Sequence, residues 1–212
     1  MKISYNRNIH KLLFSSASIV AVTAIAITSS SSPSFSYAST NVAPKTSTEK
    51  LVAYNLSVYR SNFGFKFNYS SKDFVVSQKT NRGGSNSSLA IVNIWTKEHN
   101  RKIQAGAYEG GTEYPANVQV TVSKNPQRLP LLTWIQQNQN FAATRNFKTA
   151  KIANKNAIQF ESSGLYEHKH IAVVNPKNSQ IIVVTLAQVG SGNNDAVYRR
   201  AYEQVIQSLS FN

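Results

Sequence analysis

The sequence predicts an α+β domain in which helices pack on an antiparallel sheet. Several short stretches alternate between apolar and polar residues, which is the period of a strand with one buried face. The turn 175–178, Asn-Pro-Lys-Asn, separates two apolar stretches and is typical of a β-hairpin. Two other stretches repeat apolar residues every three or four positions, as amphipathic helices do. Strands and helices are therefore expected in separate groups, which favours the α+β class.

The strands are expected in two groups, one in each half of the chain. In 63–69, phenylalanine and tyrosine alternate with glycine, lysine and asparagine, so one face of this strand is predicted to be buried. In 118–123, three valines alternate with polar residues in the same way. The full set of predicted strands is 63–69, 74–77, 89–95, 118–123, 157–160, 164–174 and 180–186.

Two helices are predicted. Pro130 suits the first position of a helix, and apolar residues then recur at three- and four-residue spacing up to Asn138, which buries Trp134. A closing helix begins near Asp195 behind a cap at Asn194. Its apolar face consists of Val197, Ala201, Val205 and Leu209.

The first 38 residues have the organisation of a secretory signal peptide. A basic start precedes an apolar run over 12–27 and a small-residue exit at Ser36-Tyr37-Ala38. We expect cleavage after this exit; an uncleaved membrane anchor is the alternative, because the apolar run is close to the minimum length for a span. Residues 39–58 are predicted to be a flexible segment and 59–212 a single domain.

The charge of the chain limits its partners. The net charge is +14 at pH 7, and +11 remains once residues 1–38 are removed. Such a charge attracts anionic partners, so we expect a membrane protein complex or an anionic membrane surface. Nucleic acid is excluded, because export is predicted and the basic residues are scattered along the chain. The chain has no cysteine, so one hydrophobic core must hold the domain together, and we expect a monomer.

Catalysis is not predicted. After residue 38 the chain has three histidines, two aspartates and no cysteine, so sets of nucleophile, base and orienting group are few. The sequence contains no Gly-x-Ser-x-Gly elbow, no phosphate-binding glycine loop and no His-Glu-x-x-His helix. We therefore expect a protein that is not an enzyme.

One set of side chains is a candidate metal site. If 166–171 is a strand, His168 and His170 lie on the same face, about 6.5 to 7 Å apart along the strand. A nearby carboxylate, Glu161, could complete a site for a divalent metal ion, the one cofactor that this pattern indicates. The alternative is ordinary polar alternation on an exposed strand.

Two segments are candidate partner-docking surfaces. The densest basic set is Arg145, Lys148, Lys151 and Lys155, with a solvated strand edge as the alternative. The loop 108–115 gathers Glu109, Glu113 and Tyr114 with two glycines, and it is either a recognition loop or a long connector.

The two tryptophans raise a separate question. Trp95 and Trp134 are predicted to belong to the core rather than to form ligand-stacking platforms.

The order and local sequence of these segments resemble the PsbP-like proteins, whose type member is an extrinsic lumenal subunit of photosystem II. The stretch 59–69, Tyr-Arg-Ser-Asn-Phe-Gly-Phe-Lys-Phe-Asn-Tyr, is similar to the first strand of that family. The end of the chain, from Tyr202 through Ser208-Leu209-Ser210-Phe211, is similar to its terminal helix and ending. The resemblance implies an α/β/α sandwich around an antiparallel sheet, in proteins that dock onto larger complexes.

Two functions are compatible with these predictions. The first is an exported, non-catalytic extrinsic protein that docks electrostatically on a membrane protein complex, with photosystem II as the complex that the resemblance implies. Its location is then the thylakoid lumen or the periplasm, peripheral to the membrane. The alternative is a soluble periplasmic protein that binds a small ligand or a metal ion.

Overall fold

The structure is a computed structural model that describes residues 56–81, 88–110, 113–189 and 195–212. The predicted signal peptide over 1–38, most of the predicted flexible segment and the predicted Asn194 cap lie outside the described residues. These described residues belong to one compact unit. In the described part of the chain, no helix has both the length and the apolar character that crossing a membrane requires.

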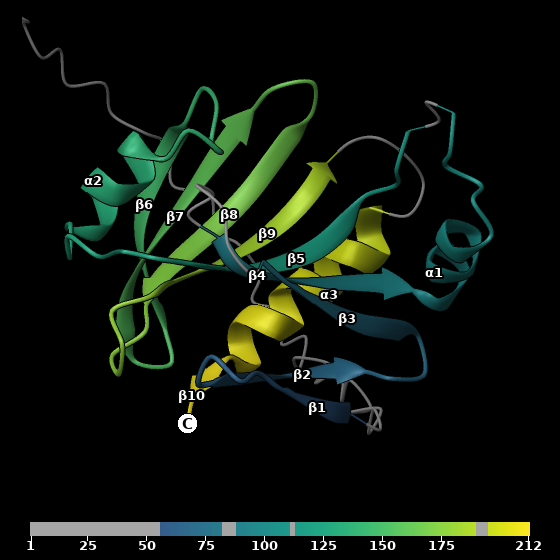
Figure 1. Cartoon of the computed structure of the whole chain (residues 1–212), viewed down its shortest axis with the longest axis horizontal. Helices are drawn as coiled ribbons and strands as arrows, with labels where there is room; N and C mark the ends of the chain where they lie inside the picture. The colour runs from purple at the N-terminus through teal and green to yellow at the C-terminus, as the bar shows by residue number, and fades with distance from the viewer. Residues whose placement is uncertain (1–55, 82–87, 111–112, 190–194) are drawn as a thin grey trace, which may run out of the picture. The chain divides into compact units, whose positions relative to one another are not determined.

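Seven antiparallel strands form the main sheet, in the order β3-β4-β5-β9-β8-β7-β6 (Figure 1). A smaller sheet has the order β1-β2-β10. The strands are β1 (Leu56–Arg60), β2 (Phe65–Ser70), β3 (Phe74–Thr80), β4 (Ser88–Thr96), β5 (Asn117–Ser123), β6 (Arg145–Ile152), β7 (Lys155–Ser163), β8 (Glu167–Val174), β9 (Ile181–Val189) and β10 (Ser210–Phe211). Both sheets pair neighbours in an antiparallel manner, as predicted for the α+β class.

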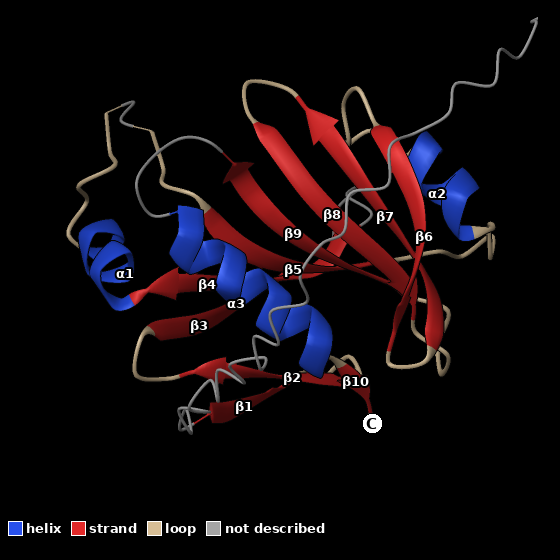
Figure 2. Cartoon of the chain, turned by 180° about the vertical axis from the view of Figure 1, so that it is seen from behind, coloured by secondary structure: helices blue, strands red, loops and turns tan. Residues whose placement is uncertain are grey.

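The long C-terminal helix α3 (Asp195–Ser208) covers one face of the main sheet, as Figure 2 shows from behind. Its buried residues, among them Tyr198 and Val205, pack on the inward valines and isoleucines of β4, β5 and β9. Phe65 and Phe67 of β2 close the same core from the small sheet, and both are fully buried. The apolar face predicted for this helix is therefore the one that builds the main core.

The short helix α2 (Leu131–Gln137) lies on the opposite face, over β7 and β8. There Trp134 and Ile135 pack on Phe160 and Ala172, whereas the alternate residues of the same strands face α3. Because helices cover both faces of the sheet, the architecture is an α/β/α sandwich, as the resemblance implied. Trp134 belongs to the core, as predicted.

Four elements were not predicted, each for a local reason. Helix α1 (Lys97–Gln104) has the sequence Lys-Glu-His-Asn-Arg-Lys-Ile-Gln, whose single aliphatic residue gives no apolar stripe. Strand β6 is exposed along most of its length, so it shows little alternation. Strand β10 has two residues. Strand β1 begins at Leu56, three residues before the predicted start of the domain, and most of its side chains are exposed or half-buried.

Candidate functional site

A groove of about 800 Å³ follows the face of the main sheet that α3 leaves open. Helices α1 and α2 lie at opposite ends of this sheet (Figure 1). Asn100 and Ile103 of α1 line the groove at one end, and Asn138 and Phe141, just after α2, line it at the other. Its floor consists of outward side chains of β4, β5, β9, β8 and β7. We call this surface the sheet groove.

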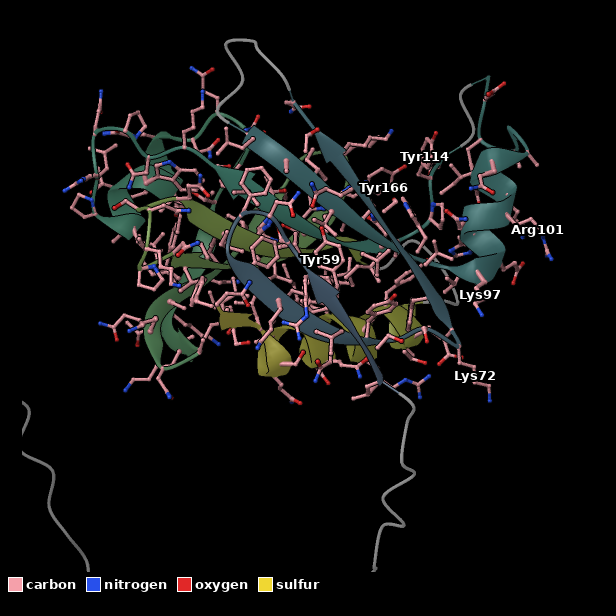
Figure 3. The ribbon with its side chains drawn as sticks, turned by 60° about the horizontal axis from the view of Figure 1, so that its bottom comes forward. Tyr59, Lys72, Lys97, Arg101, Tyr114 and Tyr166 are labelled. Carbon is pink, nitrogen blue, oxygen red and sulfur yellow. The ribbon has the colours of Figure 1, made fainter. Side chains whose placement is uncertain are left out.

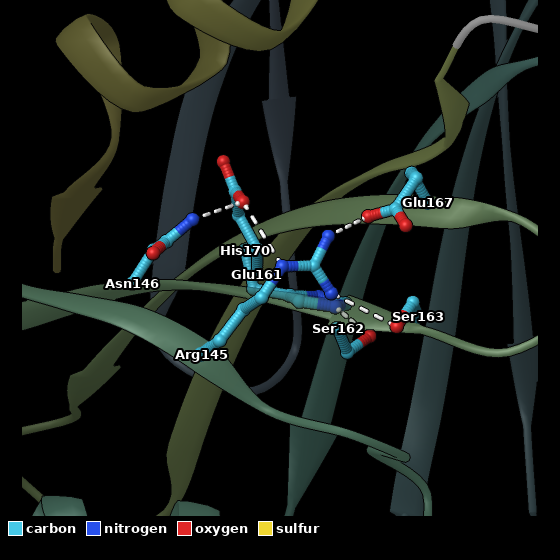
Figure 4. A network of polar contacts seen from close by, with 7 residues as sticks. All are labelled: Arg145, Asn146, Glu161, Ser162, Ser163, Glu167 and His170. Atoms are coloured by element: carbon cyan, nitrogen blue, oxygen red, sulfur yellow. Dashed lines mark hydrogen bonds and ion pairs between the residues drawn. The ribbon is translucent and has the colours of Figure 1, made fainter.

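His170 is buried in the floor of the sheet groove, with 3% of its surface exposed. Its Nε2 lies 2.7 Å from the Ser162 hydroxyl oxygen and its Nδ1 lies 2.9 Å from the Thr185 hydroxyl oxygen. Figure 4 shows the contact with Ser162. Burial lowers the pKa of His170 to about 3, with a smaller contribution from His168. The imidazole is therefore neutral, and both of its nitrogens are already hydrogen-bonded.

The predicted metal site needs a correction. His168 and His170 do share one face of β8, as predicted, with ring centroids 6.0 Å apart. Glu161, however, pairs with Lys169 and lies on the opposite face of the sheet, where Arg145 and Asn146 bind its carboxylate. Three residues on two faces cannot share one ion. Within the described ranges, no group of three or more histidine, cysteine or acidic side chains is arranged to hold a metal.

The basic set on β6 and at the start of β7 does not form one surface either. Arg145 forms ion pairs with Glu161 and Glu167 and donates a hydrogen bond of 2.8 Å to Ser163 (Figure 4), so its charge is compensated. Lys148, Lys151 and Lys155 are exposed. The register pairs Lys148 with Gln159 and Lys151 with Asn156, which places these two lysines on opposite faces of the edge strand. The four residues therefore do not form one docking patch.

The predicted recognition loop closes the α1 end of the sheet groove. Tyr114 is 46% exposed and stacks on Tyr108, with ring centroids 5.2 Å apart, and its ring lies 6.3 Å from that of Trp95. Interaction with the Glu113 carboxylate raises the pKa of Tyr166. Glu109 folds back against Gly106 at the end of α1. Residues 111–112 lie outside the described part of the chain.

Trp95 occupies a different place from the one predicted. It is half-buried, packs on the edge of the main core and lines the sheet groove. Its ring therefore contacts the core on one side and belongs to the groove surface on the other. The alternation of β4 explains this, because Ala90, Val92 and Ile94 occupy the inward positions and Trp95 takes the outward one.

Three exposed cations form a surface that the sequence does not reveal. Lys72 lies in the turn between β2 and β3, and Lys97 and Arg101 lie on α1; Figure 3 shows all three side chains along one end of the domain. The backbone N–H of Lys97 donates to the Asp73 carbonyl at 3.0 Å, which holds the turn against the start of the helix. None of the three forms an ion pair with a described carboxylate. We call Lys72, Lys97 and Arg101 the basic end.

The neighbouring charges do not neutralise this surface. Glu98 is the acidic residue on the first turn of α1, and it pairs with Lys102 at 2.8 Å, one turn further along. That pair lowers the pKa of Glu98 and raises the pKa of Lys102, because each group stabilises the charged form of the other. Asp73 and Glu203 also line the hollow beside Lys72 and Lys97, as does Arg200, so the positive charge of the basic end is reduced but not cancelled. This grouping is not visible along the chain, since Lys72 is 25 residues away from Lys97.

Comparison with known proteins finds similarity to solved structures. No protein-family model matches the chain, and no curated protein does. Among solved structures, the chain is similar to cyanobacterial PsbP (CyanoP) from Synechocystis sp. PCC 6803, determined in solution, with 14% sequence identity and a TM-score of 0.46. The match covers 80% of this chain and 99% of that chain. It is to the family that the sequence resembles, and it concerns the fold alone.

Proposed function

We propose that this protein is an exported, non-catalytic module that docks through its basic end on an acidic face of a membrane protein complex. The observation that carries the proposal is the grouping of Lys72, Lys97 and Arg101, which the fold brings together and none of which forms an ion pair with a described carboxylate. Photosystem II is the first complex to test, because the sequence resembles PsbP-like proteins. The thylakoid lumen or the periplasm is the corresponding location.

Charge of this kind favours weak, salt-sensitive docking. An exposed ion pair contributes about 0.2–1 kcal/mol, so a single pair would not hold the protein on a partner. Three neighbouring cations on a mature chain of net charge +11 also raise the rate of encounter with an acidic surface. The attraction is screened over about 10 Å at 0.1 M salt, so the complex should dissociate at moderate ionic strength.

Among the described residues, one contact resembles catalytic machinery, and its chemistry supports a non-catalytic role. Ser162 and His170 are within hydrogen-bond distance, as a nucleophile and its base would be. The pKa of His170 is lowered to about 3, so the imidazole is a poor base near neutral pH. Its other nitrogen contacts the Thr185 hydroxyl, which cannot compensate an imidazolium charge as a carboxylate would. Ser162 is also 4% exposed, so a substrate has little access to its hydroxyl.

The test is to identify what the mature protein touches. Membranes of the native host are treated with a lysine-reactive cross-linker at low salt and again after washes of increasing salt, and the cross-linked peptides are identified by mass spectrometry. We expect cross-links from Lys72 and Lys97 to subunits of a membrane complex, lost as the salt concentration rises. Cross-links to photosystem II subunits would identify that complex. Recovery of the protein without neighbours at low salt, or retention at high salt, would contradict electrostatic docking.

A further inference from the structure

We propose that the sheet groove is a binding site for a neutral oligosaccharide. This site is separate from the basic end, and the inference does not depend on docking. The argument uses a buried donor without an acceptor, the lack of charge in the groove, a row of amide and hydroxyl side chains across its floor, and an aromatic surface at one end.

Asn117 is the buried donor. It is the first residue of β5, its surface is 2% exposed, and its side chain lines the sheet groove. No acceptor among the described residues takes a hydrogen bond from its Nδ2. A buried donor left unpaired is destabilising, so a ligand that brings an acceptor oxygen recovers this free energy. The position of Asn117 at the groove surface therefore indicates a ligand with oxygen acceptors.

The charge of the groove indicates that this ligand is neutral. No aspartate or glutamate in the described part of the chain lines the groove, and its single lysine, Lys79, is exposed on the edge strand β3. His170 is neutral because burial lowers its pKa. A cationic ligand would find no carboxylate here, and an anionic ligand would find one peripheral ammonium group. A charged ligand would lose its hydration without a compensating partner.

Polar side chains form a row across the floor of the groove, in which Asn93 and Gln119 present amides and Thr185 and His170 are bonded to each other. The register places Asn93 of β4 opposite Gln119 of β5, Gln119 opposite Thr185 of β9, and Thr185 opposite His170 of β8. Neighbouring strands lie about 4.8 Å apart, so this row extends about 14 Å across four strands. Amides and hydroxyls each donate and accept hydrogen bonds, as the hydroxyl groups of a sugar also do. An extended chain of hydroxylated rings therefore matches the row better than a ligand with one polar end.

An aromatic surface lies at the α1 end of this row. Trp95 and Tyr114 both line the groove, with ring centroids 6.3 Å apart and planes inclined by 41°. The pairing of Ile94 with Val118 places Trp95 next to Asn117 in the register. A sugar ring has a C–H face that packs on an aromatic ring and oxygens at its rim that accept hydrogen bonds. Trp95, Tyr114 and Asn117 together supply both kinds of contact. The volume of about 800 Å³ is also within the range of small-molecule sites, about 300–1,000 Å³.

The test uses the folded domain and three neutral probes: maltotriose, cellotriose and N,N′,N″-triacetylchitotriose. Each is titrated into isotope-labelled protein, and backbone amide shifts are followed by NMR. We expect at least one probe to give saturable shifts in the strands that carry Asn93, Asn117 and Thr185, with no comparable shifts on α3. The absence of saturable shifts with all three probes, or saturable shifts confined to residues outside the groove, would overturn the proposal.

Substitutions in the sheet groove test whether the sugar binds there. Thr121→Val is nearly isosteric and removes one hydroxyl from the groove wall, and Asn117→Asp replaces the unpaired donor with an acceptor. Each should weaken binding about 3- to 10-fold, the effect of one lost neutral hydrogen bond. Asn156→Ala, on the exposed end of β7, is the control and should leave the affinity unchanged. If Asn117→Asp does not fold, the affinity of Thr121→Val is the test. Unchanged affinity in the groove variants that fold would overturn the proposal.

Discussion

At the scale of single residues, the two histidines of β8 show what a sequence reveals and what it does not. Alternate residues of one strand lie on the same face, so the sequence alone correctly predicted that His168 and His170 share a face. Whether residues of two neighbouring strands share a face depends on the register of the pairing. The turn after β7 sets this register by pairing Ser162 with His168. Glu161 comes directly before Ser162 in β7, so its side chain lies on the opposite face of the sheet from the two histidines. Burial of His170 and the loss of its basicity depend on tertiary packing and had no local signal.

The buried His170 predicts a dependence of stability on pH. The unfolded histidine binds a proton near pH 6.5, whereas the folded one stays neutral down to about pH 3. Between these values the unfolded state holds the extra proton, so the stability that His170 supports is present above pH 6.5 and is lost as the pH falls toward 3. The groups that face its ring are Ser162, Thr185, Phe141, Phe160 and His168. None of them is acidic.

Urea unfolding of the parent and of His170→Gln at pH 7, 6, 5 and 4 measures this effect. The parent should lose a few kcal/mol of unfolding free energy over this range, and His170→Gln should lose clearly less. The matched control is His168→Gln, a change of the same residue type two positions away. Burial also lowers the pKa of His168, but that side chain is only half-buried, so its substitution should flatten the pH profile less. Identical pH profiles for the parent and His170→Gln would contradict this assignment.

At the scale of elements, the strands with strong alternation and the terminal helix were predictable, because one face of each is buried. Helix α1 and strand β6 were not, because their side chains are largely exposed and their stability comes from neighbours. For α1 these are the Thr96 hydroxyl, which accepts from the His99 N–H at 3.1 Å, and the His99 ring, which lies 2.8 Å from the Tyr198 hydroxyl on α3. The turn between β8 and β9 was predicted from its own sequence, yet its main contact is with a distant segment.

That turn gives a prediction about stability. Asn175 is fully buried; its Nδ2 donates to the Phe63 carbonyl at 2.9 Å, and its Oδ1 accepts from the Lys177 N–H at 3.0 Å. Asn175→Ala should lower the unfolding free energy by about 1–3 kcal/mol, because it leaves buried groups unpaired. Asn178→Ala is the control: Asn178 bonds to Gln180 in the same turn but is exposed, so its loss should cost about 0.5 kcal/mol or less. Equal costs in thermal or urea unfolding would refute the role of the Phe63 contact.

At the scale of the whole molecule, the sequence predicted the sign and size of the charge but not its arrangement. The densest basic run along the chain, on β6, is partly neutralised by Glu161 and Glu167 and is divided between two faces. The basic end combines a turn with a helix that the sequence did not predict. It lies beside β3 and β4, whereas β6 is at the opposite edge of the sheet. The two surfaces can therefore be tested against each other.

The most direct test of docking compares two triple variants with the same change in charge. Lys72→Glu/Lys97→Glu/Arg101→Glu reverses the basic end, and Lys148→Glu/Lys151→Glu/Lys155→Glu reverses the edge at β6. Each is mixed with host membranes stripped of extrinsic proteins, and the bound fraction is measured by sedimentation at about 20 and 300 mM salt. We predict that the parent binds only at low salt, that the β6 variant keeps most of this binding, and that the basic-end variant loses it. Equal losses in the two variants, or full binding by the basic-end variant, would contradict docking through Lys72, Lys97 and Arg101.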